Sequence, residues 1–139
     1  MKALVDTNVV LDVLLNRAVF FAHSRAIFEF IEQKKITGYI TASSITDIFY
    51  LIKKEVGNNE VVYQAIEKLT ALFTVVPVTE MTIASALALR WKDFEDAVQF
   101  MAAKENGMTC ILTRNEADYE SSDIPCMSPS DFIAKFGWF

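Results

Sequence analysis

The stretch Lys2-Ala3-Leu4-Val5-Asp6-Thr7-Asn8 places an apolar run directly before an acid, close to the first residue of the 139-residue chain. Its three consecutive apolar residues predict a buried strand over residues 2–6, because a run without polar alternation is typical of a strand covered on both faces. Burying a carboxylate at the end of such a strand is costly unless donors or a cation compensate it. Asp6 is therefore the first candidate for a functional residue.

The same succession of strand-like and helix-like segments continues along the chain and predicts the α/β class. We expect a three-layer α/β/α sandwich with a mainly parallel sheet of about four to five strands, as a single domain over residues 1–139. Further strands are predicted at residues 38–41, 73–78, 109–112 and 125–127. Helices are predicted at residues 8–15, 21–33, 43–56, 59–72, 82–91, 96–105 and from residue 129 onward.

Local signals set several of these boundaries. Ser43 or Ser44 is expected to be the N-cap of the helix that follows the second strand, and Gly57 to end that helix. Pro77 cannot donate a ladder hydrogen bond, so the third strand is expected near an edge of the sheet.

Composition limits the possible functions. Apolar residues make up 53% of the chain, which supports a sizeable core and argues against disorder. The net charge of −5 argues against a broad basic face for nucleic acid but leaves open an RNA substrate. Cys110 and Cys126 lack metal-ligand or redox-pair spacing and are interpreted as small buried hydrophobes. An acid at position 6 comes too early for a signal peptide, and no apolar stretch approaches the ~20 residues of a membrane helix, so we expect a soluble cytoplasmic protein.

Three further acidic segments lie where predicted strands end or predicted helices begin. They contain Asp47, the pair Asp93 and Asp96, and Asp118. In an open α/β sheet these places share one edge, where the carboxyl ends of the strands converge. Crowded carboxylates repel one another unless a cation neutralises them, and oxygen ligands suit Mg²⁺ or Mn²⁺. We therefore predict that Asp6, Asp47, Asp96 and Asp118 bind metal and carry catalysis.

Each acid also has a structural explanation. The spacing from Ser44 to Asp47, and from Asp93 to Asp96, is that of a capping box. Such a motif would place Asp47 and Asp96 in the first turn of a helix. The remaining two acids would then be ordinary loop residues. The four acids together favour a metal site, because Asp6 closes an apolar strand and both helix N-termini point to the same sheet edge. Capping and metal binding can coexist, with one carboxylate oxygen for each.

The chemistry of phosphodiester hydrolysis matches such a site. The reaction requires a nucleophilic water and stabilisation of charge on the phosphate oxygens. One metal ion lowers the pKa of the water, and a second, roughly 4 Å away, can hold the leaving oxygen. The sequence has no histidine cluster, serine nucleophile motif or cysteine–histidine pair that would offer another route. A metal-dependent phosphodiester hydrolase is the leading interpretation.

Short polar residues flank these acids. Thr7, Asn8 and Ser43 are candidates for hydrogen bonds to ligand carboxylates, water or substrate, with turn or cap chemistry as an equal alternative. Thr113 and Asn115, before the last acid, belong to the same group of candidates.

Other residues receive a structural interpretation first. Asp93 is interpreted as a helix cap, with metal binding or orientation of a neighbouring acid as alternatives. Arg17 and Arg114 are interpreted as solvated cations, with contact to an RNA phosphate as the alternative. His23, on a helix, is given a structural role. The aromatic ending Phe136-Gly137-Trp138-Phe139 is expected to pack on its own domain, or to form part of a dimer or antitoxin surface.

These motifs resemble those of the PIN-domain nucleases, most closely the bacterial and archaeal branch that includes VapC-type toxins. Asp6-Thr7-Asn8-Val9 is similar to the family's opening motif. Residues 96–103, an aspartate followed by an alanine-rich helix, are similar to its third acidic motif. The run from Thr113 through Asp118 is similar to its fourth. The resemblance spans nearly the whole chain, with the motifs in the family's order.

Two positions depart from the family pattern. Asp47 stands where the family usually has a glutamate, so a side chain shorter by one methylene must reach the metal from a different backbone position. Asn115 stands where aspartate is frequent, and its carbonyl can ligate but brings no charge. Asp118 is the residue that would supply that charge.

The resemblance implies a Mg²⁺- or Mn²⁺-dependent endoribonuclease, a toxin role with a small antitoxin partner, and a homodimer. A non-catalytic PIN-like binding module would keep the fold and lose the metal. A phosphoacceptor signalling domain shares the acidic edge, but it would have an aspartate after the third strand and a lysine after the fifth. Here the third strand ends in Val76-Pro77-Val78, and no lysine directly follows the fifth. A dinucleotide enzyme is disfavoured, since no Gly-x-Gly-x-x-Gly follows the first strand.

Overall fold

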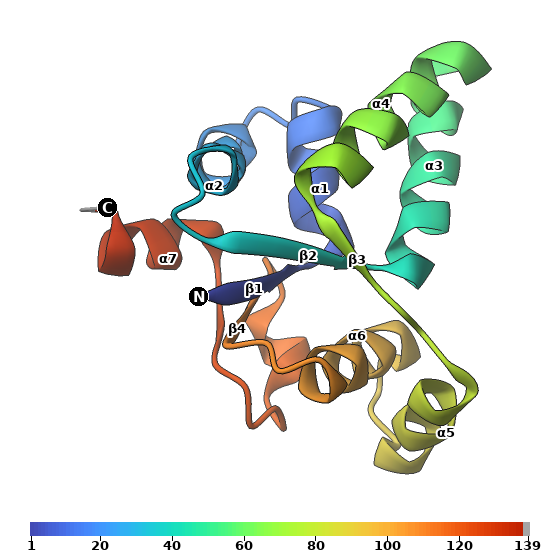
Figure 1. Ribbon diagram of the computed structural model, residues 1–139, viewed down its shortest axis with the longest axis vertical. Coiled ribbons are helices and arrows are strands. Elements are labelled where there is room, and N and C mark those ends of the chain that lie inside the picture. Colours follow the sequence, from blue (N-terminus) through green and yellow to red (C-terminus); the bar gives the residue numbers. More distant parts are fainter. Residues whose placement is uncertain (138–139) are drawn as a thin grey trace.

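Five parallel strands form the sheet at the centre of the computed structural model, which describes residues 1–137 (Figure 1). Their order across the sheet is β3-β2-β1-β4-β5, and each neighbouring pair is parallel. The strands are β1 (Lys2–Val5), β2 (Thr37–Thr41), β3 (Thr74–Val76), β4 (Cys110–Leu112) and β5 (Cys126–Met127). All strands therefore end at the same edge, and the central strand β1 delivers the residue after Val5 to the middle of it.

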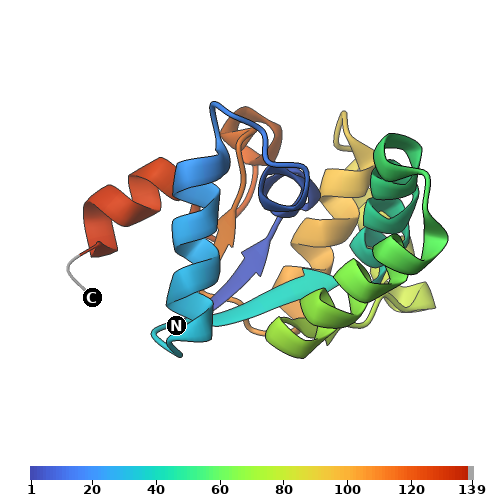
Figure 2. The same ribbon diagram turned by 90° about the horizontal axis from the view of Figure 1, so that it is seen from above.

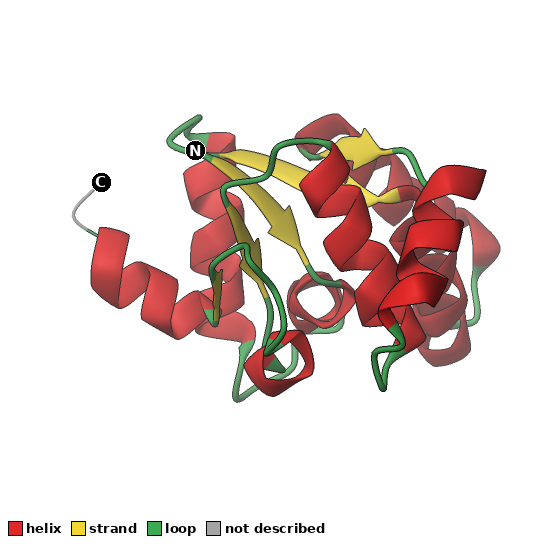
Figure 3. Ribbon diagram, turned by 90° about the horizontal axis from the view of Figure 1, so that it is seen from below, coloured by secondary structure: helices red, strands yellow, loops and turns green. Residues whose placement is uncertain are grey.

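Helices cover both faces of the sheet and confirm the predicted three-layer arrangement (Figure 1, Figure 3). On one face lie α1 (Thr7–Leu14), α2 (Phe21–Glu32), α3 (Ala42–Val56), α4 (Asn59–Leu72) and α7 (Pro129–Phe136). On the other lie α5 (Glu80–Leu89), α6 (Phe94–Glu105) and the 3₁₀ helix η1 (Glu116–Tyr119).

Successive residues of β1 enter different cores, which explains the absence of polar alternation in this strand. Ala3 and Val5 pack into the core beneath α1, α2 and α3, whereas Leu4 packs against Phe100 and Tyr119 on the opposite face. Side chains of a strand alternate between the two sides of its sheet, so a strand covered on both sides must be apolar throughout.

The five strands and the α-helices lie within two residues of the bounds that were predicted for them, whereas η1 was not predicted. The predicted cap at Ser43 or Ser44 is wrong, because β2 runs directly into α3 and its last residue, Thr41, is the N-cap, with Oγ1 accepting the backbone N–H of Ser44 at 3.2 Å. Gly57 ends α3 as predicted, with φ at 78° in the left-handed region that glycine tolerates best. β3 is an edge strand that stops before Pro77, also as predicted.

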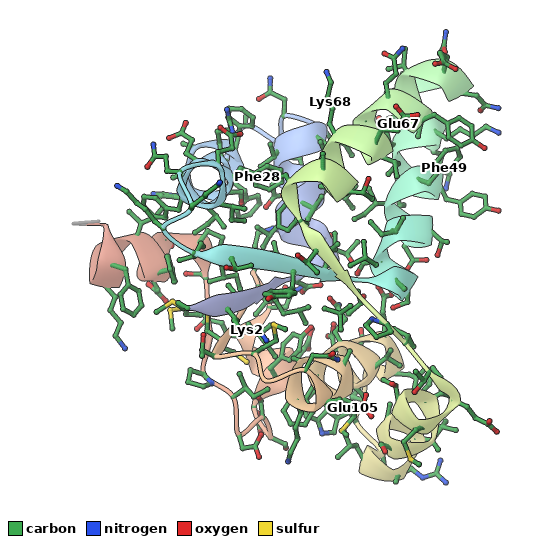
Figure 4. All side chains as sticks on the ribbon, in the orientation of Figure 1. Lys2, Phe28, Phe49, Glu67, Lys68 and Glu105 are labelled. Atoms are coloured by element: carbon green, nitrogen blue, oxygen red, sulfur yellow. The ribbon has the colours of Figure 1, made fainter. Side chains whose placement is uncertain are left out.

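The α5–α6 pair is tied together by a polar contact. The hydroxyl of Thr82 on α5 donates to the carboxylate of Glu105 on α6 at 2.7 Å, and Glu105 is labelled in Figure 4. The short connection between the two helices, residues 90–93, reaches the carboxyl edge of the sheet, since Asp93 lines the cavity described below.

The last helix, α7, packs beside α2 (Figure 2). Phe132 is fully buried there, with its ring centroid 6.2 Å from that of Phe30 and 4.8 Å from that of Phe136. Phe136 therefore packs on its own domain as predicted, while Trp138 and Phe139 lie outside the described residues. Within residues 1–137, no helix combines the length and the apolar character needed to cross a membrane.

Candidate active site

A cavity of about 370 Å³ lies at the carboxyl edge of the sheet, between α1, α3, α6 and the segment that follows β4. All four predicted ligands line it, and two further acids join them. Six carboxyl groups therefore share one cavity in a protein whose net charge is already −5. The lining residues are Asp6, Thr7, Asn8, Asp47, Tyr50, Leu51, Asp93, Glu95, Asp96, Asn115 and Asp118.

Asp6 directly follows β1 and is buried at the centre of this edge. Gln99 Nε2 donates to its Oδ1 and Thr113 Oγ1 donates to its Oδ2, both at 2.8 Å. Gln99 lies on α6, and Thr113 directly follows β4, the strand that pairs with β1. They compensate part of the cost of burying the carboxylate, and each oxygen keeps a further lone pair for a cation.

Asp96, Asp93 and Asp118 form the tightest acidic group of the cavity. One carboxylate oxygen from each lies within 4.8 Å of the other two. Oxygen ligands at about 2.1 Å from a Mg²⁺ ion are up to about 4.2 Å apart, so small side-chain movements suffice to hold one ion here. The donor set, made of carboxylate oxygens, is the type that Mg²⁺ and Mn²⁺ prefer.

Asp93 is the N-cap of α6, as predicted. Its Oδ1 accepts the backbone N–H of Asp96 at 3.0 Å, so the helix begins at Phe94 rather than at Asp96. A cap of this kind occupies one carboxylate oxygen and leaves the other directed to the cavity.

The pKa of the Asp96 carboxyl is strongly shifted by its surroundings. Burial, followed by the charges of Asp6 and Asp93, raises the pKa of Asp96 from 3.8 to about 7, although a hydrogen bond from Tyr119 opposes the shift. The Tyr119 hydroxyl donates to Asp96 Oδ1 at 3.2 Å. Burial and the neighbouring charges of Asp6 and Asp96 raise the pKa of Tyr119, so this hydroxyl remains a proton donor. A cation in the cavity would offset the repulsion from Asp6 and Asp93 and so favour the ionised form of Asp96.

Asp47 lies inside α3, one and a half turns after the helix begins, so its interpretation as part of a capping box is wrong. It faces Glu95 across the cavity. Partial burial, then a hydrogen bond with Asp47 and its charge, raises the pKa of the Glu95 carboxyl from 4.5 to about 7, although the residue as a whole is exposed. Glu95 is a cavity residue that the sequence analysis missed, because it was treated only as a spacer between Asp93 and Asp96.

Of the short polar residues predicted to flank the acids, all but one lie at the acidic cavity or contact an acid of it. Thr113 contacts Asp6, as described, and Asn115 lines the cavity with its backbone N–H donating to Thr113 Oγ1 at 3.0 Å. Asn8 also lines the cavity, whereas Ser43 is outside the lining and shares a 3.1 Å hydrogen bond with the Thr41 hydroxyl. Thr7 lines the cavity too, and its hydroxyl lies 2.6 Å from that of Ser44, which connects α1 to α3.

A second charged network lies beside the cavity, around Asp12 of α1. This acid is fully buried, and its carboxylate pairs with Arg114 at 2.8 Å and with Arg17 at 3.4 Å. The interpretation of these two arginines as solvated cations is therefore wrong. The pair between Asp12 and Arg114 connects α1 to the segment that carries Asn115 and Asp118 into the cavity. An acid at a helical position within the apolar run of residues 9–15 was the available signal for Asp12.

Comparison with known proteins places this arrangement in context. A profile of the family described as "PIN domain" matches residues 2–117 of the chain. Ribonuclease VapC1 from Aquifex aeolicus (strain VF5) is 24% identical over 140 residues, which cover 97% of this chain and 95% of the relative. The fold is similar to that of FitAcB from Neisseria gonorrhoeae, with a TM-score of 0.72, 19% identity, and coverage of 92% of this chain and 98% of the other. It is also similar to a chain of a toxin–antitoxin complex from Klebsiella pneumoniae, with a TM-score of 0.67, 20% identity, and coverage of 91% and 97%.

Proposed function

Because the chain belongs to the PIN domain family, we propose that it is a Mg²⁺- or Mn²⁺-dependent endoribonuclease. The observation that carries this proposal is the cavity of about 370 Å³ in which six carboxyl groups converge. Ionised acids so close together repel one another, and a bound cation would relieve that repulsion. The relative from Aquifex aeolicus, which is named as a ribonuclease and aligns over nearly the whole chain, supports RNA as the substrate.

The proposed metal ligands are Asp6, Asp47, Asp96 and Asp118, with a carboxylate oxygen of Asp93 close to the last two. The bound ion would supply a water of lowered pKa and would neutralise charge on the phosphate oxygens. Gln99 and Thr113 orient the Asp6 carboxylate, and Tyr119 orients that of Asp96. These donors fix the ligand oxygens before substrate arrives, which lowers the cost of organising the site during reaction.

The proposal is tested by metal-dependent stability together with RNA cleavage. In protein stripped with a chelator, millimolar Mn²⁺ should raise Tm, because a ligand that binds only the native state at 100 Kd stabilises it by about 2.7 kcal/mol. Asp96→Asn should reduce the shift, and Asp131→Asn, an exposed acid of α7 outside the cavity, should leave it intact. RNA cleavage should require the same metal. Identical melting curves with and without Mn²⁺ would count against the site.

We also propose that the chain is the toxin of a toxin–antitoxin pair. A toxin–antitoxin complex from Klebsiella pneumoniae contains a chain that shares this fold, which supports a small protein partner. Expression of the chain alone in a bacterial host should then slow growth, and the inactive Asp6→Asn variant should not. Normal growth during expression of a soluble, RNA-cleaving protein would contradict the toxin role and leave the nuclease proposal intact.

A homodimer through α5 is the third part of the proposal. Residues 81–89 contain no charged side chain, yet Met81 is 67% exposed and Leu87 is 49% exposed. A helix that is apolar on all sides is normally buried, so a second copy that covers this surface would resolve the mismatch.

Leu87→Glu should convert a dimer into a monomer, because it places a charge in the centre of this surface. Light scattering coupled to size-exclusion chromatography measures the mass directly. Val61→Glu, at a similarly exposed apolar residue of α4, is the matched control and should keep the dimer. A monomeric wild-type protein, or a dimer unaffected by Leu87→Glu, would contradict the assignment.

A further inference from the structure

A second cavity adjoins the acidic one. It has a volume of about 590 Å³ and shares the lining residues Asp93 and Asp118 with the acidic cavity, so the two cavities are neighbours. Its other side is formed by the connection between α5 and α6 and by the segment around η1. The lining residues are Leu89, Arg90, Trp91, Lys92, Asp93, Ala117, Asp118, Glu120 and Ser121.

Two exposed cations, Arg90 and Lys92, line this cavity. Within residues 1–137, neither takes part in a salt bridge or a side-chain hydrogen bond that would neutralise it. By contrast, Arg17 and Arg114 on the other side of the acidic cavity share the buried carboxylate of Asp12. Among the described residues that line the two cavities, Arg90 and Lys92 are the cations, and they can attract a polyanion to this part of a protein of net charge −5.

The backbone of Arg90 is unusual for its residue type. Arg90 ends α5 in the left-handed conformation, with φ at 55° and ψ at 34°, where glycine is the favoured residue. An L-residue other than glycine pays roughly 1–2 kcal/mol for this conformation. Glycine would therefore fit the backbone at this position, so the side chain can be removed there without straining the chain.

The aromatic residue between the two cations is already engaged in the core. The Trp91 ring stacks on Phe100 at 4.9 Å between centroids and meets the edge of Tyr119 at 5.9 Å. One face of the Trp91 ring is thus covered by Phe100 and is closed to a nucleotide base. Beside its acids, the cavity offers the two cations and the hydroxyl of Ser121, and such groups commonly contact the phosphates of a nucleic acid.

We propose that Arg90 and Lys92 form a binding site for the phosphodiester backbone of the RNA strand, next to the scissile phosphate. This inference rests on the proposed ribonuclease function, since it takes the strand to pass from the acidic cavity across Asp93 and Asp118 into the second cavity. In this site Arg90 and Lys92 would contact backbone phosphates, which are the same at every nucleotide. The site would therefore position the strand without reading its sequence. Glu120 on the opposite wall is the one carboxylate that would remain unneutralised when metal occupies the neighbouring cavity.

The test uses the salt dependence of RNA binding. A fluorescein-labelled single-stranded RNA is titrated with the full-length protein in Ca²⁺, and anisotropy gives Kd over a series of salt concentrations. Each phosphate contact contributes about 0.7 to the slope of log K against log salt for a single strand. The double variant Arg90→Gly, Lys92→Gln should raise Kd at least ~10-fold at low salt and reduce the slope by about 1.4. Glycine suits the left-handed backbone at position 90, so this change removes charge without endangering the fold.

Two control substitutions match these changes. Lys34 is also a cation in the left-handed region, with φ at 59°, but it lies between α2 and β2 at the opposite edge of the sheet. Lys34→Gly should therefore leave Kd and slope unchanged. Lys68 projects from α4 on the face of the sheet away from α5 (Figure 4), and Lys68→Gln is the control for Lys92→Gln.

The outcomes separate this site from the nuclease proposal. Equal Kd and slope for the wild type and the double variant would overturn the site, whether or not the protein cleaves RNA. An equal loss of affinity in Lys34→Gly and Lys68→Gln would also overturn it, because binding would then depend only on net charge. A reduced slope confined to the double variant would support the site even if the wild type proved unable to cleave RNA, in which case the nuclease proposal alone would fail.

Discussion

Asp6→Asn is expected to lower the rate of RNA cleavage by at least ~10²-fold, the scale of losing a few kcal/mol of transition-state stabilisation. Asp6 is buried at the centre of the acidic cavity, and its carboxylate is the proposed ligand held most firmly, by Gln99 and Thr113. Asparagine has nearly the same shape but brings no charge to a metal ion. Single-turnover cleavage of a labelled RNA with excess protein measures the chemical step directly.

The substitution should preserve the fold. An asparagine at position 6 can keep its carbonyl oxygen toward Gln99 Nε2, while its amide group donates to the hydroxyl of Thr113, which can accept as well as donate. Asp123→Asn is the control, because Asp123 is an exposed acid paired with Lys104 and lies outside the acidic cavity. Wild-type cleavage by Asp6→Asn would show that the observed activity came from another site or another protein.

The fold could be predicted because its local signals agree with its tertiary structure. Apolar runs such as Ala3 to Val5 are covered on both faces, and Gly57 has the left-handed conformation that ends a helix. The capping of α3 could not be predicted in the same way. Serine, threonine and aspartate all cap well, so a Thr-Ala-Ser-Ser run offers several equivalent caps, and only the exact end of β2 selects Thr41.

The acidic ligands could be predicted from their positions at strand ends, but their supporting contacts could not. Gln99 and Tyr119 reach Asp6 and Asp96 across 93 and 23 residues of sequence. Nothing local marks a glutamine in an alanine-rich helix as a donor to a carboxylate, although it lies three residues after Asp96 and hence on the same face of α6. The raised pKa of Glu95 likewise depends on Asp47, a residue of another helix.

The second large effect expected concerns pH. Because the pKa of Asp96 is raised to about 7 by burial and by Asp6 and Asp93, this group is largely protonated below that pH in the metal-free protein. Its folded pKa lies above its unfolded value, so its contribution to stability is fully present below about pH 4 and is lost as the pH rises through about 7. The metal-free protein should thus become less stable between these limits, while Mn²⁺, which binds the ionised form, should bind more tightly.

Mn²⁺ affinity is expected to be about 10²-fold weaker at pH 5 than at pH 8, because a ligand with a pKa near 7 loses about tenfold in its ionised fraction for each pH unit below that value. Isothermal titration of Mn²⁺ at several pH values, in buffers that do not bind metal, measures this change. Asp96→Asn should bind weakly at all pH values and flatten the dependence. Glu95→Gln removes the other carboxyl with a pKa of about 7 and leaves Asp96 in place. This variant should retain most of the pH dependence of Mn²⁺ affinity. An affinity that stays constant from pH 5 to pH 8 in the wild type would mean that Asp96 is not a ligand, because proton and metal must compete for the same oxygens.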